Sequence, residues 1–147
     1  MASNLHGTAL VIGDRGILVT GNSGAGKTTL ALALITAAQA AGRFAALVSD
    51  DQLFATAQSG RLLCSAPPAI AGLIEVRGAT PQPIRNQPNA IIDLVVRLVA
   101  ETEAPRFSED LNGVIEGCAV ACLVLGERNV QGAAPAIQSW LALRPFV

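Results

Sequence analysis

The chain of 147 residues contains one lysine, one histidine, one tryptophan and no tyrosine. Aromatic residues make up 3% of the sequence, so a platform of stacked rings for single-stranded RNA is not expected. Basic and acidic residues nearly cancel, at 10 against 11, so the chain lacks the basic excess of general nucleic-acid or membrane-surface binders. Charged residues make up 14% and hydrophobic residues 51%, which excludes intrinsic disorder.

Membrane spans, secretion signals and zinc sites also find no support. The longest apolar stretch, residues 30–41, contains Thr36 and Gln39 and is too short to cross a bilayer. The N-terminus lacks a basic region followed by an apolar run, so no secretory signal is expected. Cys118 and Cys122 have no second Cys/His pair to complete a zinc site, and their apolar neighbours predict buried thiols. We therefore expect a protein of the reducing cytoplasm.

The order of apolar runs and turn residues predicts an α/β fold with a mixed β-sheet flanked by helices. The length fits one domain, residues 1–147. We expect residues 80–89 to form a loop and residues 100–117 to be irregular. The expected elements are a hairpin of residues 8–12 and 17–20, a helix over 29–41 ended by Gly42, a strand over 44–48, a second hairpin of 52–57 and 62–65, strands over 73–77, 91–99 and 120–125, and a closing helix over 135–143 with Pro135 in its first turn.

A glycine-rich loop carries the clearest chemical signal, because it contains the only lysine. It matches G-x-x-x-x-G-K-[ST] and consists of Gly21, Asn22, Ser23, Gly24, Ala25, Gly26, Lys27 and Thr28. Its glycines let the backbone bend so that N–H groups point at phosphate oxygens, and the helix that follows adds its positive N-terminal end. Lys27 is expected to reach the β- and γ-phosphates and the Thr28 hydroxyl to ligate Mg²⁺. An apolar strand before the loop and a helix after it supply the context that this motif requires.

Acidic residues follow the next predicted strand. Asp50 and Asp51 stand where a P-loop fold places carboxylates beside the Mg²⁺ and phosphate site. One could hold Mg²⁺ or its water and the other accept a proton from an attacking hydroxyl, although a solvated turn is the alternative. Glu75 is a possible metal ligand or a charge on an edge strand. The lone His6 is, by itself, typical of a surface residue.

Four separate elements together resemble the C-terminal catalytic domain of HPr kinase/phosphorylase. They are His6-Gly7, the loop 21–28, Asp50-Asp51 and Glu75-Val76-Arg77-Gly78. His6 precedes Gly21 by fifteen positions, which agrees with the spacing in that family. The resemblance covers about residues 5–125 and implies a P-loop kinase fold similar to phosphoenolpyruvate carboxykinase. The chain looks like the short alpha-proteobacterial type that lacks the N-terminal domain.

The resemblance implies a kinase that uses ATP and Mg²⁺ to phosphorylate a serine of the phosphocarrier protein HPr, with reverse phosphorolysis in many members. It also implies a hexamer. Residues 21–28 would bind the nucleotide, with Lys27 taking part in catalysis. The resemblance assigns further roles to five residues: Asp51 as the general base toward the serine, Asp50 and Glu75 as carboxylates on the Mg²⁺ side, His6 as a neighbour of the catalytic carboxylate, and Arg77 as part of the same signature as Glu75.

The chain departs from the family pattern at several points. Thr28 stands where the family usually has serine, and residues 79–83 replace a Leu-Gly and apolar run. Arg106 is the candidate for a later family arginine, and the basic C-terminal stretch linked to phosphorolysis and HPr contact is not recognisable. Two alternatives therefore stay open. One is a small-molecule kinase, although the arginines are scattered rather than gathered in a lid. The other is a nucleotide-sensing module with little turnover.

Overall fold

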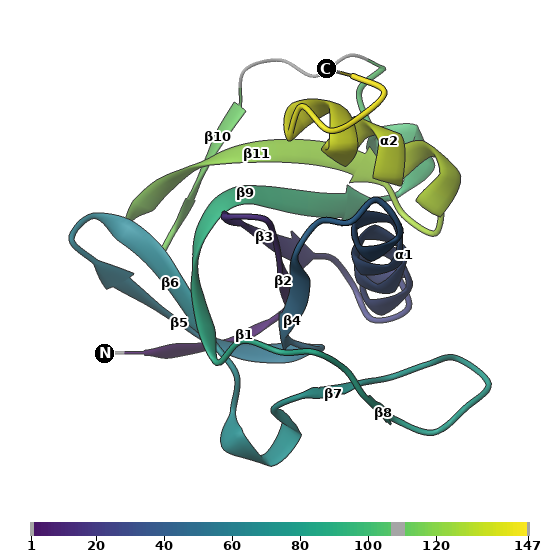
Figure 1. Cartoon of the computed structure of the whole chain (residues 1–147). Helices are drawn as coiled ribbons and strands as arrows, with labels where there is room; N and C mark the ends of the chain where they lie inside the picture. The colour runs from purple at the N-terminus through teal and green to yellow at the C-terminus, as the bar shows by residue number, and fades with distance from the viewer. Residues whose placement is uncertain (1, 107–110, 147) are drawn as a thin grey trace.

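The structure is a computed structural model that describes residues 2–106 and 111–146. A curled β-sheet forms its frame, and two helices lie on one side of that sheet (Figure 1). The strands are β1 (Ser3–His6), β2 (Thr8–Ile12), β3 (Arg15–Thr20), β4 (Ala45–Ser49), β5 (Gln52–Gln58), β6 (Arg61–Ser65), β7 (Leu73–Ile74), β8 (Gln82–Pro83), β9 (Asn89–Val99), β10 (Leu111–Ile115) and β11 (Cys118–Gly126). The helices are α1 (Lys27–Ala40) and α2 (Val130–Trp140), and short 3-10 turns are η1 (Pro68–Ile70) and η2 (Glu101–Glu103).

The long strand β9 organises the sheet. The main path runs β1-β5-β6-β9-β3-β2-β4, and β11, itself paired with β10, also pairs with β9. The first residues of β9 pair with β6 in antiparallel fashion, whereas the rest of β9 runs parallel to both β3 and β11. The carboxyl ends of β3, β9 and β11 therefore reach the same edge of the sheet, and the loops that follow them lie close together.

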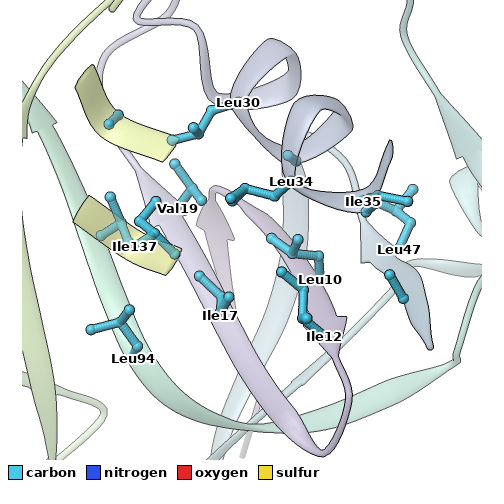
Figure 2. Packing of buried hydrophobic residues seen from close by; sticks show 14 of the residues in the cluster. Leu10, Ile12, Ile17, Val19, Leu30, Leu34, Ile35, Leu47, Leu94 and Ile137 are labelled. Carbon is cyan, nitrogen blue, oxygen red and sulfur yellow. The ribbon is translucent and has the colours of Figure 1, made fainter. Parts of the chain in front are cut away.

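The core has two layers because the central strands are buried on both faces. In β2, Leu10 and Ile12 face the helices, while Ala9 and Val11 point into the curl of the sheet. This alternation explains why β2 reads as a continuous apolar run rather than as an amphipathic strand. The helix-side cluster also draws on β3, α1, β9 and α2, as Figure 2 shows, with Ile17, Val19, Leu30, Leu34, Leu94 and Ile137.

Most of the predicted elements are confirmed. Both hairpins form, as β2–β3 and β5–β6, and the helix after the glycine-rich loop ends just before Gly42. The strand predicted over 91–99 is β9, and that over 120–125 is the core of β11. Cys118 and Cys122 are free, buried thiols, as predicted. Neither helix in the described part of the chain has the length and hydrophobicity needed to span a lipid bilayer.

The predicted closing helix over 135–143 is wrong at both ends. Helix α2 begins at Val130 and ends at Trp140, so Pro135 lies inside it rather than in its first turn. The start is set by Asn129, whose Oδ1 accepts a hydrogen bond of 3.1 Å from the backbone N–H of Gly132. Asparagine is among the best N-cap residues, and this cap determines where the helix begins.

Two further predictions need correction. Of the strand predicted over 73–77, only β7 is paired, and its partner β8 falls within the segment predicted as a loop. The pairing stops because the backbone N–H of Glu75 donates to a side chain, Asp50 Oδ2, instead of to a neighbouring strand. The segment 100–117, predicted to be irregular, contains η2 and β10. Residues 107–110 of that segment lie outside the described residues.

Candidate active site

The glycine-rich loop joins β3 to α1, which confirms the predicted strand–loop–helix context. Gly24 and Gly26 have φ angles of 82° and 91°, in the left-handed region that a side chain would make costly. Gly26 is the N-cap residue of α1, so this backbone turns the chain directly into the helix. The loop thereby lies at the N-terminal end of α1, where unpaired backbone N–H groups favour an anion.

Lys27 is held against its own loop. Its Nζ donates hydrogen bonds to the carbonyl oxygens of Gly21 (3.0 Å) and Asn22 (3.1 Å), and the residue is only 6% exposed. Burying an ammonium group is unfavourable unless it is hydrogen-bonded, and these two carbonyls supply that compensation. The single ammonium side chain of the molecule is thus fixed at the loop instead of being free in solvent.

Asp50, directly after β4, links three parts of the site. Its Oδ1 accepts hydrogen bonds from the hydroxyl of Thr8 (3.1 Å) and the hydroxyl of Thr28 (2.7 Å), and its Oδ2 accepts from the backbone N–H of Glu75 (2.9 Å). The residue is 7% exposed, so both oxygens are occupied by protein donors in a buried setting. Because the Thr28 hydroxyl donates a hydrogen bond to Asp50, the lone pairs of the Thr28 oxygen remain available to a cation.

Asp51 has a different setting, although it is the next residue. Its φ of 66° is uncommon outside glycine, and both its backbone N–H and its carbonyl are hydrogen-bonded. The N–H of Asp51 donates to the Thr8 hydroxyl (3.1 Å), and the Asp51 carbonyl accepts from the N–H of Gly7 (2.9 Å). The exposed Asp51 side chain lines a cavity, whereas that of Asp50 is enclosed.

This cavity, of about 430 Å³, brings most of the predicted site residues together. Five residues of the glycine-rich loop line it, together with Asp51, Glu75 and Arg77. The lining residues are Ser23, Gly24, Gly26, Lys27, Thr28, Thr29, Asp51, Glu75, Arg77, Arg128 and Val130. Residues far apart in the sequence therefore share one space at the N-terminal end of α1.

The other predicted residues lie around this space. Gly21 and Asn22 hold Lys27, and the buried Ala25 accepts a backbone hydrogen bond from residue 128 (2.9 Å). His6 is exposed on β1, opposite Gln52 in the pairing with β5, and is not a lining residue. Its neighbour in sequence, Gly7, is the residue that contacts Asp51.

Arg128 is the site residue that sequence reasoning missed. Its N–H donates to the Ala25 carbonyl, and its guanidinium pairs with Glu127 at 2.8 Å while lining the cavity. In the sequence it is one of several scattered arginines, and Arg106, the candidate by resemblance, does not line the cavity. Arg128 can be identified from the parallel pairing of β11 with β9, because this pairing places the end of β11 at the same sheet edge as the glycine-rich loop.

The donors at the site suit Mg²⁺ delivered with a nucleotide. Within the described residues, no three His, Cys, Asp or Glu side chains are grouped so as to hold a metal by themselves. The Thr28 hydroxyl and the carboxylates of Asp50, Asp51 and Glu75 are hard oxygen donors at or beside the cavity. Mg²⁺ typically binds through one or two such groups plus phosphate oxygens, so the residues present fit a Mg²⁺–nucleotide complex.

Comparison with known proteins gives consistent matches. The family described as HPr Serine kinase C-terminal domain matches residues 1–113. HPr kinase/phosphorylase from Clostridium tetani is 40% identical over 76 residues, which cover 52% of this chain and 23% of that protein. The corresponding protein from Bordetella petrii is 32% identical over 113 residues, covering 71% of this chain and 35% of that protein. The chain thus spans about a quarter to a third of the length of these relatives.

The fold has a close counterpart among solved structures. The HPr(Ser) kinase/phosphatase from Coxiella burnetii superposes with a TM-score of 0.72 at 24% sequence identity, covering 92% of this chain and 93% of that one. The shared architecture confirms the predicted mixed α/β fold, and the P-loop follows from the family match. Together with the match over residues 1–113, it completes the assignment: the chain belongs to the HPr serine kinase C-terminal domain family.

Proposed function

We propose that residues 1–147 form one catalytic domain that transfers the γ-phosphoryl group of ATP to a serine hydroxyl of an HPr-like phosphocarrier protein. One observation carries this proposal: the side chain of Asp51 lines the same cavity as Lys27 and Thr28 of the P-loop. A nucleotide held at the loop would therefore present its terminal phosphate to a carboxylate that the protein leaves exposed. Membership of the HPr kinase family supports the choice of acceptor.

In the proposed mechanism, the P-loop binds and orients the triphosphate. Lys27 would leave its two carbonyl partners to contact the β- and γ-phosphates, and residues 21–28 would surround the phosphate chain. Mg²⁺, when bound, would neutralise charge on the transferring group. Thr28 and Glu75 are the side chains proposed to hold it, with Asp50 orienting the Thr28 hydroxyl from behind.

Asp51 is the proposed general base. Its carboxylate would accept the proton of the serine hydroxyl as the serine oxygen bonds to the γ-phosphorus, and the bond from that phosphorus to the bridging oxygen of ADP would break. In the reverse direction, inorganic phosphate would attack the phosphoserine, pyrophosphate would form, and protonated Asp51 would return the proton to the serine oxygen. The protein supplies positioning and electrostatic stabilisation, because phosphoryl transfer needs little covalent chemistry.

The remaining residues have supporting roles in this proposal. Arg77 and Arg128 line the cavity and would stabilise negative charge on the transferring phosphoryl group. His6 would act through its neighbour Gly7, which holds the backbone of Asp51. A cytoplasmic location, expected from the unpaired cysteines, and a hexameric assembly, implied by the resemblance to the family, are proposed with the function.

Incubation with γ-labelled ATP and Mg²⁺ tests the proposal directly. The protein should label purified HPr, and HPr whose acceptor serine is replaced by alanine should stay unlabelled. Label on a metabolite would identify a small-molecule kinase, and tight ATP binding without transfer would identify a sensor; either result contradicts the proposal. Addition of inorganic phosphate to labelled HPr should release pyrophosphate if the reverse reaction is also catalysed.

A further inference from the structure

A second cavity, of about 410 Å³, lies away from the P-loop near the far end of α1. It is lined by residues of the C-terminal half of α1, the end of β2 and the segment around and after α2. The lining residues are Ile12, Leu34, Ala37, Ala38, Ala41, Arg43, Gln138, Leu143 and Arg144. Ala38 is eleven residues beyond Lys27 in one continuous helix, which places this space roughly 16 Å along the helix from the nucleotide site.

Most of the residues that line this cavity are apolar, but Arg43 and Arg144 line it as well. Arg43 and Arg144 are exposed, and within residues 2–106 and 111–146 neither has a carboxylate partner. Three other arginines do have such partners, namely Arg15, Arg61 and Arg128 with Asp14, Asp93 and Glu127. Among the described residues, no carboxylate pairs with either of the two arginines at the cavity, in a chain whose net charge is −1.

Two further arginines lie on neighbouring segments, and one of them, Arg15, is paired with a carboxylate. Arg85 lies over the ring of Phe44, next to Arg43, and Arg15 lies over the ring of Trp140, each with a guanidinium carbon 5.8 Å from the ring centre. A hydrogen bond of 2.8 Å from the Gly13 N–H to the Phe44 carbonyl ties these segments together. Asp14 is the acidic residue in this turn, and it pairs with Arg15 at 3.9 Å.

The C-terminal carbonyls of α1 would ordinarily repel an anion. Here some of these carbonyls accept hydrogen bonds from the backbone N–H groups of the residues that follow the helix. The N–H of Arg43 donates to the Ala38 carbonyl (2.9 Å), and the N–H of Gly42 donates to the Gln39 carbonyl (3.0 Å). Gly42 has the positive φ of 76° that this helix-terminating motif requires. The carbonyls of Ala38 and Gln39 thus have hydrogen-bond donors, and Arg43 and Arg144 are the charged residues among those that line the cavity.

We propose that this cavity binds an amphipathic organic anion, whose carboxylate or phosphate group contacts Arg43 and Arg144 and whose hydrocarbon part packs on Ile12, Leu34 and Leu143. The volume falls within the range typical of small-molecule sites. Gln138 offers one additional hydrogen-bonding side chain at the wall. The site is separate from the nucleotide cavity and shares no lining residue with it, so the proposal stands whether or not the kinase function is correct.

Binding can be followed through Trp140, the only tryptophan, because it belongs to the helix that carries Gln138. The intact protein is titrated with octanoate and with monooctyl phosphate, and calorimetry is run in parallel. At least one of these anions should bind saturably, and comparing them identifies the preferred head group. Octanol and acetate should bind at least about tenfold more weakly, because octanol lacks the anionic group and acetate lacks the hydrocarbon chain. Absence of saturable binding by both anions, or equal binding of octanol, would overturn the proposal.

Variants locate the site. Arg43→Gln and Arg144→Gln should each weaken binding of the preferred anion by about tenfold or more, because each removes a charged hydrogen-bond donor. Ala37→Leu should abolish binding by filling the cavity from the exposed side of α1. Arg61→Gln, on β6 and away from the cavity, is the matched control and should bind normally. Urea unfolding confirms that each variant is folded, and unchanged affinity in both arginine variants would contradict the assignment.

Discussion

At the scale of single residues, Thr8 connects the two acids of the proposed active site. Its hydroxyl donates to Asp50 Oδ1 and accepts from the backbone N–H of Asp51, each over 3.1 Å, and the residue is completely buried. One hydroxyl therefore satisfies a buried carboxylate and holds the unusual backbone of the next residue. Its removal should leave the N–H of Asp51 without this partner and take one of three hydrogen-bond donors from the Asp50 carboxylate.

Thr8→Val keeps the shape of the side chain but removes this hydroxyl. We expect the free energy of unfolding to fall by about 1–3 kcal/mol, the usual cost of leaving a buried polar group unpaired. Urea denaturation measures the change. Thr36→Val, at an exposed position of α1, is the control and should change stability by less than about 0.5 kcal/mol. Equal effects of the two substitutions would show that the Thr8 hydroxyl has no special role.

Cys64 predicts a specific loss of stability in alkali. Burial raises the pKa of its thiol from 9.0 to about 12. Below pH 9 the thiol is protonated in both states and has no effect. Between pH 9 and pH 12 the unfolded chain releases this proton while the folded chain retains it, so stability falls as pH rises, by at most roughly 1.4 kcal/mol per pH unit.

Unfolding free energies measured from about pH 8 to about pH 10.5 test this linkage. Cys64→Ala should lose stability less steeply than the unaltered protein over that interval. Burial also raises the pKa of the Cys122 thiol, against the opposing effect of Arg97, but that contribution is common to both proteins. Parallel curves for the two proteins would mean that the Cys64 thiol ionises equally readily in the folded state.

At the scale of elements, the parallel pairing of β3 with β9 positions the P-loop. Gly16 makes this pairing possible, because a Cβ there would lie 2.0 Å from the Ile91 carbonyl oxygen. Its N–H also donates to Asp93 Oδ2 over 2.9 Å, so β3 is tied to β9 by both a close approach and a side chain. The register of the strand that feeds the phosphate-binding loop depends on this glycine.

Gly16→Ala should therefore destabilise the protein by several kcal/mol or prevent folding, since the clash is with backbone rather than with a movable side chain. Gly13→Ala is the control: its φ is 62°, but nothing lies within 4 Å of the added carbon, so a cost of about 1 kcal/mol is expected. Thermal unfolding and soluble yield measure both. A Gly16→Ala protein as stable as Gly13→Ala would contradict the described pairing.

The elements that local patterns determine could be predicted from the sequence. The two hairpins follow from short apolar runs around turn residues, and the P-loop helix follows from the motif and Gly42. Elements that depend on a distant partner could not. Strand β7 ends before Glu75, because the Glu75 N–H donates to Asp50, 25 residues earlier in the sequence. The start of α2 depends on the N-cap Asn129, whereas the sequence prediction relied on Pro135.

At the scale of the whole molecule, the active site depends on how distant segments meet. The acid pair could be placed near the P-loop from sequence, because both follow apolar strands. Which acid is enclosed and which is exposed could not, since that difference depends on the φ of Asp51 and on Thr8, more than forty positions earlier. The role of Arg128 could not be predicted from the sequence either, because the pairing of β11 with β9 brings it to the loop.

The most direct test of the proposed function is the Asp51→Asn variant, because asparagine also tolerates a positive φ and preserves the shape of the turn. Asp14→Asn, at an exposed turn, is the matched control. The rate of phosphoryl transfer from γ-labelled ATP to HPr is measured beside the dissociation constant for ATP. We expect Asp51→Asn to transfer at least about 100-fold more slowly while ATP affinity changes by less than about threefold. Transfer at a near-native rate by this variant would contradict the assignment of Asp51 as the base.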